Sequence, residues 1–215
     1  PEVIDVPPVD SFRRPPRLSL AIRGVGGQGN LFFGKVLAQV AFLAGYDDRN
    51  ILKGETHGMA QMGGPVISTF GCGEVFSPAL VPGTANVLIA MEKAEVLRPG
   101  FLDLLEPGGT VLMADTHILP HGLKPEAYPS DEAIAAQLEG YRVVSVDVLS
   151  IALNLGDPKG RCANVAMLGV LSTLPPFDVV PEAVWLQALR GISRKPALWD
   201  LNHAAFMAGR GMQKG

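Results

Sequence analysis

A glycine-rich turn between a strand pattern and a helix pattern constrains this chain more than any other feature. The alternating apolar run Leu18–Ile22 precedes the turn, and the amphipathic run Leu31–Ala44 follows it. Between them, Gly24, Gly26 and Gly29 match the pattern G-x-G-x-x-G. Glycines let backbone N–H groups approach a ligand closely, and the N-terminus of the following helix adds partial positive charge. The turn therefore predicts a site for a phosphate, pyrophosphate or carboxylate, although the same glycines could serve only to pack the helix on the sheet.

A second unusual stretch, Lys53–Pro65, reads as a loop that is dense in hydrogen-bonding groups. It holds four glycines and one proline and has no sustained apolar period. It follows a short apolar piece, Asn50–Leu52, which can form the second strand. Loops that leave the C-terminal ends of parallel strands lie on one edge of the sheet. We therefore expect this loop and the glycine turn to form a binding crevice together.

Strand and helix patterns alternate along the rest of the chain. Strands are expected at 85–91, 110–115 and 141–147. Helices are expected at 92–105, with an interruption at Pro99-Gly100, and at 130–140, 148–155, 161–174, 181–190 and 197–209. Two short β-rich runs, 66–70 and 74–76, flank Gly71–Gly73 and predict an antiparallel hairpin. This order predicts a Rossmann-like α/β fold, a three-layer α/β/α domain with a mostly parallel sheet.

The domain organisation follows from length and proline content. Residues 1–17 are proline-rich and lack any period, so they predict an extended arm or linker whose apolar side chains would be buried best against a partner. Residues 18–215 are long enough for one substantial core and predict a single domain.

Composition excludes several classes of function. The formal net charge is −3 and no cluster of Lys and Arg is present, which argues against a nucleic-acid binder or an anionic-membrane binder. The two cysteines are too few for a disulfide framework, a zinc site or a cysteine-ligated iron–sulfur cluster. No apolar run approaches the roughly 20 residues of a membrane span. We expect a cytoplasmic protein.

Few side chains suggest catalysis. His57 lies on the second loop and could transfer a proton, although an ordinary hydrogen-bonding role is the alternative. The histidines do not fall at metal-ligand spacings, so no metal site is expected. Asn164 lies in a nearly uncharged helix and needs partners, either backbone groups of the glycine loops or a ligand. Cys162 in the same helix is expected to be buried as a small hydrophobe.

A dinucleotide fold would need an acid at the end of the second strand. Asp47 and Asp48 have the spacing but precede that strand, and Glu55 follows it somewhat late. The dinucleotide fingerprint is therefore imperfect.

Taken together, the two loops resemble a known family. The matching segments are Gly24–Gly29, Glu55–Gly64, Ser77–Pro78, and Asn164 with Leu168–Gly169. Their joint order is similar to the gamma subunit or domain of 2-oxoacid:ferredoxin oxidoreductases, the pyruvate ferredoxin/flavodoxin oxidoreductase family, and within it to the beta subunits of indolepyruvate oxidoreductases. Met62 departs from the arginine usual in that family, which puts an anion contact there in doubt. Pro65 is a second departure.

The resemblance implies a component of an enzyme that oxidatively decarboxylates a 2-oxoacid, an aryl pyruvate by the nearest resemblance, to acyl-coenzyme A, carbon dioxide and reduced ferredoxin. Thiamine diphosphate and [4Fe-4S] clusters would belong to companion subunits or domains, so the isolated chain would be inactive. The two loops would present groups toward coenzyme A or the neighbouring active site. The candidate binding residues are Gly24, Gly26, Gly27, Gln28, Gly29, Asn30, Glu55, Thr56, His57, Gly58, Gln61, Gly63, Gly64 and Asn164.

Two alternatives come from other classes of protein. A free-standing NAD(P)-binding dehydrogenase would bind nicotinamide cofactor without a partner. A purely structural assembly subunit would use its glycines for packing alone. The proline-rich arm favours a component of an assembly over a free enzyme.

Overall fold

A six-stranded mixed sheet forms the centre of the molecule. A computed structural model of the chain describes residues 3–25, 29–56, 65–119 and 124–212. The strands are β1 (Arg17–Val25), β2 (Ile51–Thr56), β3 (Pro65–Gly73), β4 (Ala85–Ala90), β5 (Leu105–Ala114) and β6 (Arg142–Val146). In the part of the chain described they are ordered β2-β3-β1-β4-β5-β6.

All of these strands except β3 run in the same direction. β4 pairs in parallel with both β1 and β5, and β5 pairs in parallel with β6. β3 is antiparallel to both of its neighbours, β1 and β2. Every residue of β4 is buried, as expected for a strand covered on both faces. The mostly parallel sheet with an antiparallel pair is therefore confirmed.

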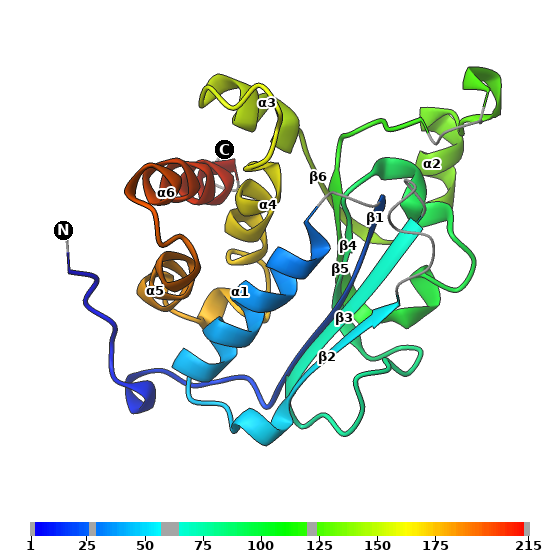
Figure 1. Cartoon of the computed structure of the whole chain (residues 1–215). Coiled ribbons are helices and arrows are strands. Elements are labelled where there is room, and N and C mark those ends of the chain that lie inside the picture. The colour runs from blue at the N-terminus through cyan, green and yellow to red at the C-terminus, as the bar shows by residue number, and fades with distance from the viewer. Residues whose placement is uncertain (1–2, 26–28, 57–64, 120–123, 213–215) are drawn as a thin grey trace.

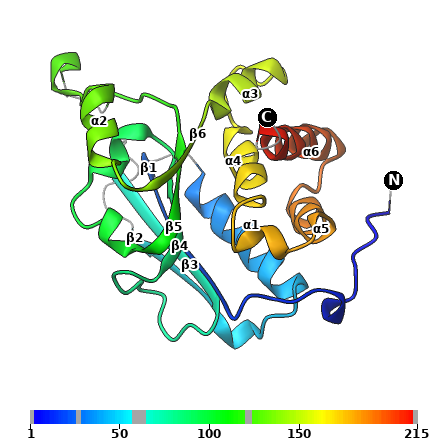
Figure 2. The same ribbon diagram turned by 180° about the vertical axis from the view of Figure 1, so that it is seen from behind.

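Helices cover the two faces of the sheet unequally (Figure 1). The larger layer holds α1 (Asn30–Leu43), α3 (Val148–Asn154), α4 (Ala163–Leu171), α5 (Glu182–Ile192) and α6 (Pro196–Gly211). The other face carries α2 (Asp131–Gln137) and the short 3-10 helices η4 (Lys93–Leu97) and η5 (Leu102–Leu104), as the reverse view also shows (Figure 2). One apolar core lies under each layer, which gives the expected three-layer α/β/α arrangement.

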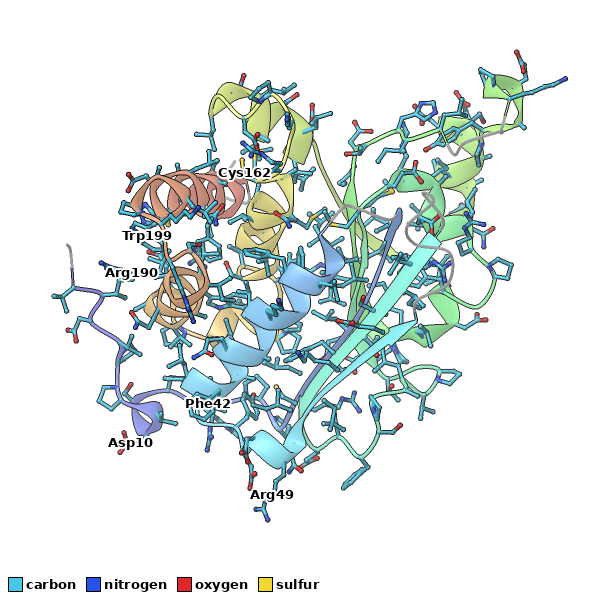
Figure 3. All side chains as sticks on the ribbon, in the orientation of Figure 1. Asp10, Phe42, Arg49, Cys162, Arg190 and Trp199 are labelled. Atoms are coloured by element: carbon cyan, nitrogen blue, oxygen red, sulfur yellow. The ribbon has the colours of Figure 1, made fainter. Side chains whose placement is uncertain are left out.

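The helices of the larger layer pack very closely in two places. Ideal Cβ atoms at Gly169 of α4 and Gly209 of α6 would lie 2.1 Å from the Phe206 carbonyl oxygen and 2.0 Å from the Ala166 carbonyl oxygen. Between α5 and α6, the Arg190 guanidinium lies over the Trp199 ring, 5.5 Å from its centroid (Figure 3). These contacts fix α4, α5 and α6 as one block on the sheet.

The predicted hairpin through Gly71–Gly73 is wrong. Gly71 and Cys72 lie inside β3, where they pair with β1 on one side and β2 on the other. A strand held by two neighbours continues through glycine, and β3 ends only at Gly73, where φ is +84°. The antiparallel hairpin is instead formed by β2 and β3, joined by residues 57–64.

The helix expected at 92–105 was also wrong. The segment forms η4 and η5, because the break at Pro99-Gly100 leaves too few residues for a stable α-helix. The remaining predicted helices are present with slightly different ends.

The N-terminal arm is extended apart from one 3-10 turn, Val9–Ser11. Its apolar residues were expected to need a partner, yet Val6 and Phe12 pack against the core of this chain itself. Val3 is 88% exposed, so only part of the arm is covered in this way.

Candidate functional site

The two special loops are anchored at the same edge of the sheet. β1 ends at Val25, which pairs with Pro65, the first residue of β3. β2 ends at Thr56, which pairs with Ile67 of the same strand. The glycine turn therefore leaves the sheet beside the point where the second loop enters and leaves it. This is the shared edge predicted from the sequence.

The structure describes only some of the residues proposed from the sequence. Gly24 is buried within β1 and pairs with Val66, so the turn begins after it. Glu55 and Thr56 were expected in the loop that begins at Lys53, but pairing with β3 makes them the last residues of β2, and Pro65 already belongs to β3. Asn30 is the first residue of α1. Eight of the proposed residues lie outside the described ranges: Gly26, Gly27, Gln28, His57, Gly58, Gln61, Gly63 and Gly64.

Gly29 and Asn164 are brought together across the larger helical layer. Gly29 is the N-cap residue of α1 and adopts a left-handed conformation with φ of +85°. A Cβ atom at this position would lie 2.3 Å from Nδ2 of Asn164 in the first turn of α4. Asn164 is 8% exposed, and its Oδ1 atom is buried without a hydrogen-bond partner. A buried acceptor of this kind is costly unless a donor is supplied.

A pocket of about 420 Å³ opens beside these two residues. Its volume lies within the range typical of small-ligand sites. The described residues that line it follow the ends of β4 and β5, lie at the starts of α1, α3 and α4, or lie in the connection between α3 and α4: Gly29, Met91, Thr116, His117, Ile118, Val148, Leu149, Lys159, Gly160, Arg161, Ala163 and Asn164. The pocket therefore lies at the C-terminal edge of the parallel strands, where α/β proteins bind ligands.

The described lining of the pocket is basic. Lys159, Arg161 and His117 contribute to it, and no carboxylate is among its described residues. The sequence analysis did not select these three residues. Their positions along the chain could have indicated them. His117 follows the strand β5, and Lys159 and Arg161 lie in the connection between α3 and α4.

A buried aspartate holds the loop before α4. Asp157 Oδ2 accepts a hydrogen bond from the Cys162 N–H at 2.9 Å, and Oδ1 accepts one from Arg161 Nε at 3.2 Å. Burial alone would raise the pKa of Asp157, but these hydrogen bonds and the positive charge of Arg161 hold it below its ordinary value. The loop that carries Lys159 and Arg161 is thus fixed by a charged anchor.

Tyr128 connects His117 to a second buried acid. The His117 ring stacks on Tyr128 with 3.7 Å between centroids, and the Tyr128 hydroxyl donates to the carboxylate of Glu92. Glu92 is 2% exposed. Burial and the neighbouring carboxylate raise the pKa of Tyr128 well above its ordinary value, so the hydroxyl keeps its proton.

The two cysteines have the chemistry of core residues. Burial raises the pKa of the Cys72 thiol to about 12 and that of Cys162 to about 11. Cys162 lies at the start of α4 (Figure 3). Protonated buried thiols are poor metal ligands and poor nucleophiles. Within the described ranges, no group of three His, Cys, Asp or Glu side chains could hold a metal ion.

Asp47 and Asp48 do not lie where a dinucleotide fold would need an acid. The antiparallel strand β3 lies beside β1, in the position that the second parallel strand of a dinucleotide fold would occupy. Asp47 and Asp48 lie just before β2, at the opposite edge from the glycine turn, and Asp47 is paired with Arg49. These two aspartates therefore cannot bind a ribose held at the turn.

Comparison with known proteins now identifies the family. The family model described as pyruvate ferredoxin/flavodoxin oxidoreductase matches residues 19–212. The chain belongs to this family. Indolepyruvate oxidoreductase subunit IorB of Archaeoglobus fulgidus is 35% identical over 159 residues, which is 72% of this chain and 76% of that subunit. The pyruvate ferredoxin/flavodoxin oxidoreductase family is the one that the joint order of motifs indicated.

Solved structures related to this family share the fold. Pyruvate oxidoreductase subunit PORC of Thermotoga maritima aligns with a TM-score of 0.66 at 20% identity, covering 91% of this chain and 96% of that chain. The 2-oxoglutarate:ferredoxin oxidoreductase of Magnetococcus marinus, solved with 2-oxoglutarate, coenzyme A and succinyl-CoA bound, aligns with a TM-score of 0.67 at 19% identity. The match covers 94% of this chain but 32% of that chain, so the same fold also occurs within a longer polypeptide. In the described part of this chain, no helix is both long enough and apolar enough to cross a membrane.

Proposed function

We propose that the chain is a gamma-type subunit or domain of a thiamine-diphosphate-dependent 2-oxoacid:ferredoxin oxidoreductase. The substrate would be an aryl pyruvate, oxidatively decarboxylated to an acyl-coenzyme A with electrons passed to ferredoxin. Membership of the family and the IorB relative support this assignment. The cytoplasmic location expected from the sequence stays a prediction.

The redox chemistry would belong to partner subunits or domains. Thiamine diphosphate would form the reactive adduct there, and [4Fe-4S] clusters would carry electrons to ferredoxin. The cysteines of this chain do not suit a cluster, since both thiols are buried and have raised pKa values. The chain is therefore expected to act only within the assembled enzyme.

The role of this chain would be to hold coenzyme A at the edge formed by the two loops. One observation carries the proposal: Asn164, whose buried Oδ1 has no hydrogen-bond partner, packs against the left-handed N-cap residue of α1, and both residues line a pocket that also carries basic side chains. An orphaned buried acceptor beside a helix N-terminus is the pattern expected of a site that a polar ligand completes. A structural neighbour, the Magnetococcus enzyme, is described with coenzyme A bound.

The test is an Asn164→Leu substitution in the purified complex. Leucine has a similar size and removes the unpaired acceptor, so the complex should assemble while its KM for coenzyme A rises at least 10-fold. Reduction of the clusters by the 2-oxoacid in the absence of coenzyme A should be unchanged. A KM for coenzyme A within 2-fold of the wild-type value would contradict the proposal.

Asn202→Leu provides the matched control. Asn202 is also buried, but its Nδ2 donates to Ser193 Oγ at 2.8 Å in the connection between α5 and α6. This variant should lose thermal stability and keep its KM for coenzyme A. In a separate assay, the isolated chain should show no turnover with thiamine diphosphate and a 2-oxoacid. Turnover by the isolated chain would refute the proposal that partner subunits or domains carry out the redox chemistry.

A further inference from the structure

The two outer strands of the sheet differ in how their free edges are protected. At one end, β2 exposes the charged side chains of Lys53 and Glu55. Pro78 also lies against β2, since a Cβ atom at Gly54 would be 3.1 Å from the Pro78 carbonyl oxygen. Exposed charges and covering loops stop a sheet edge from pairing with another chain. At the other end, which faces the viewer in Figure 2, β6 carries one charged residue, Arg142, and of the described strands only β5 pairs with it.

The backbone of β6 presents two residues on its outer side. The Val146 carbonyl oxygen accepts a hydrogen bond from the Asp115 N–H at 2.9 Å, so the backbone groups of Val146 face β5. Backbone groups alternate in direction along a strand, and the register with β5 is unbroken from Arg142 to Val146. The N–H and C=O groups of Val143 and Ser145 therefore face away from β5. Among the described residues, no turn or loop hydrogen bond between backbone groups involves either of them.

A groove of about 360 Å³ lies on the α2 side of the same strand. Val143 and Ser145 both line it, because side chains two positions apart in a strand share a face. Ile134 and Leu138 of α2 and Met113 of β5 make its lining largely apolar. Free backbone groups beside such a groove are the combination by which sheets bind extended peptides. The main chain supplies the hydrogen bonds, and the groove accepts alternate side chains of the peptide.

One end of the groove carries excess negative charge. Lys93 Nζ lies 2.6 Å from Asp131 Oδ1 and 3.5 Å from Asp115 Oδ1, so one ammonium group faces two carboxylates. The side chains of Asp131 and Asp115 are 75% and 57% exposed, so both can reach a further cation. Asp115 follows Ala114, which pairs with Val146, so this charge lies at the C-terminal end of β6. A basic side chain is the partner that this end of the groove favours.

A second copy of this chain would not supply that basic side chain through its own β6. On the groove side, β6 presents Val143 and Ser145, and neither residue is charged. Pairing of two β6 strands would therefore leave the carboxylates of Asp115 and Asp131 unmatched. Relatives of this chain are named as subunits of larger enzymes, so another subunit is the source that can supply a different strand.

We propose that β6 and this groove receive an extended segment of another subunit of the assembled enzyme, which adds to the sheet as one more strand. The segment places apolar side chains in the groove and a lysine or arginine at its acidic end. The inference goes beyond the proposed function, since strand addition does not depend on the 2-oxoacid or the coenzyme used. It rests on that proposal only for the presence of a partner subunit.

Hydrogen exchange resolved to single residues tests the added strand directly. The full chain is measured alone and within the purified complex. The N–H groups of Val143 and Ser145 should exchange at least 10-fold more slowly in the complex, whereas those of Val144 and Val146, which face β5, should be slow in both samples. Equal exchange of Val143 and Ser145 in the two samples would overturn the inference. Protection in the isolated chain that grows with its concentration would also overturn it, because a second copy would then pair with β6.

Ala135→Arg tests the groove. Ala135 is exposed and lines the groove one helical turn after Asp131, so the new side chain would fill the groove and pair with that carboxylate. The dissociation constant of the chain from the rest of the complex should rise at least 10-fold. Ala136→Arg is the matched control, because Ala136 is exposed on the same helix and is not among the described residues that line the groove.

The control should bind the rest of the complex within 2-fold of wild type, and the two variants should unfold at similar temperatures. Equal binding by both variants would contradict the role assigned to the groove. A complex with protected β6 amides but no dependence on coenzyme A contradicts only the proposed function. A complex that requires coenzyme A while the amides of Val143 and Ser145 stay unprotected contradicts only the added strand.

Discussion

The backbone of Gly29 lies so close to Asn164 that no larger residue fits without displacement, since a Cβ atom at position 29 would be 2.3 Å from Nδ2 of Asn164. This contact joins the N-terminus of α1 to the N-terminus of α4 and defines one wall of the pocket. Gly29 is therefore required both for its left-handed backbone and for the space beside it.

Replacing Gly29 with alanine should destabilise the protein and weaken coenzyme binding. The left-handed conformation costs a residue with a Cβ atom about 1 to 2 kcal/mol, and overpacking against Asn164 adds about 1 to 3 kcal/mol. Chemical denaturation should measure the sum. Gly83→Ala separates the two effects, because Gly83 also has a positive φ of +74° but nothing lies within 4 Å of the position that its Cβ atom would take. Equal losses in the two variants would show that Asn164 yields without cost.

Gly169→Ala should be strongly destabilising despite the high helix propensity of alanine. Its new Cβ atom would meet the Phe206 carbonyl of α6, and overpacked sites of this kind cost about 1 to 3 kcal/mol or more. Gly191→Ala in α5 is the control, since nothing lies within 4 Å of its Cβ position. That change should stabilise the protein by about 0.5 to 1 kcal/mol. Thermal unfolding curves should move in opposite directions for the two variants.

Tyr128→Phe should loosen the segment that carries His117. The substitution removes the donor to the buried carboxylate of Glu92, and a hydrogen bond to a charged group contributes about 1.5 to 3 kcal/mol. The free energy of unfolding from urea titrations measures the loss. Tyr141→Phe is the control because Tyr141 is 40% exposed. A difference of less than a few tenths of a kcal/mol between the two variants would contradict the role assigned to Glu92.

The anchor formed by Asp157 should make part of the stability depend on pH. The folded state lowers the pKa of this carboxyl below the ordinary value of 3.8, so its stabilising contribution is complete above that value. The contribution is lost as pH falls through the lower, folded-state pKa. In Asp157→Asn the free energy of unfolding should therefore fall at pH 7 and converge on that of the wild type in strong acid. Parallel pH profiles for the two proteins would contradict this linkage.

Local sequence patterns predicted most strands and helices because their signals are short-range. The apolar run 85–91 became the fully buried β4, and Ser130 caps α2 by accepting from the Ala133 N–H at 3.2 Å. β3 shows where such patterns fail. Gly71 and Gly73 have the local composition of a turn. Because β3 pairs with β1 and β2 on its two sides, the strand continues through Gly71 and ends only at Gly73.

The site was predicted only in part for the same physical reason. The glycine turn and Asn164 were recognised from local composition and from the family pattern, and the structure brings Gly29 and Asn164 together. Lys159, Arg161 and His117 carry no local signal, since single basic residues on connections are common on any surface. They become a set only because the segment after β5 and the connection between α3 and α4 line the same pocket.

The ladder between β1 and β3 has a consequence for how such proteins can diverge. Its pairs run without interruption from Arg17 with Gly73 to Val25 with Pro65. It fixes where the second loop joins β3 relative to the glycine turn, and the pairing of Thr56 with Ile67 fixes where that loop leaves β2. Residues within that loop can then differ in sequence while its two ends stay in place. The strands, and not the residues of the loop, therefore set where the loop is held beside the glycine turn.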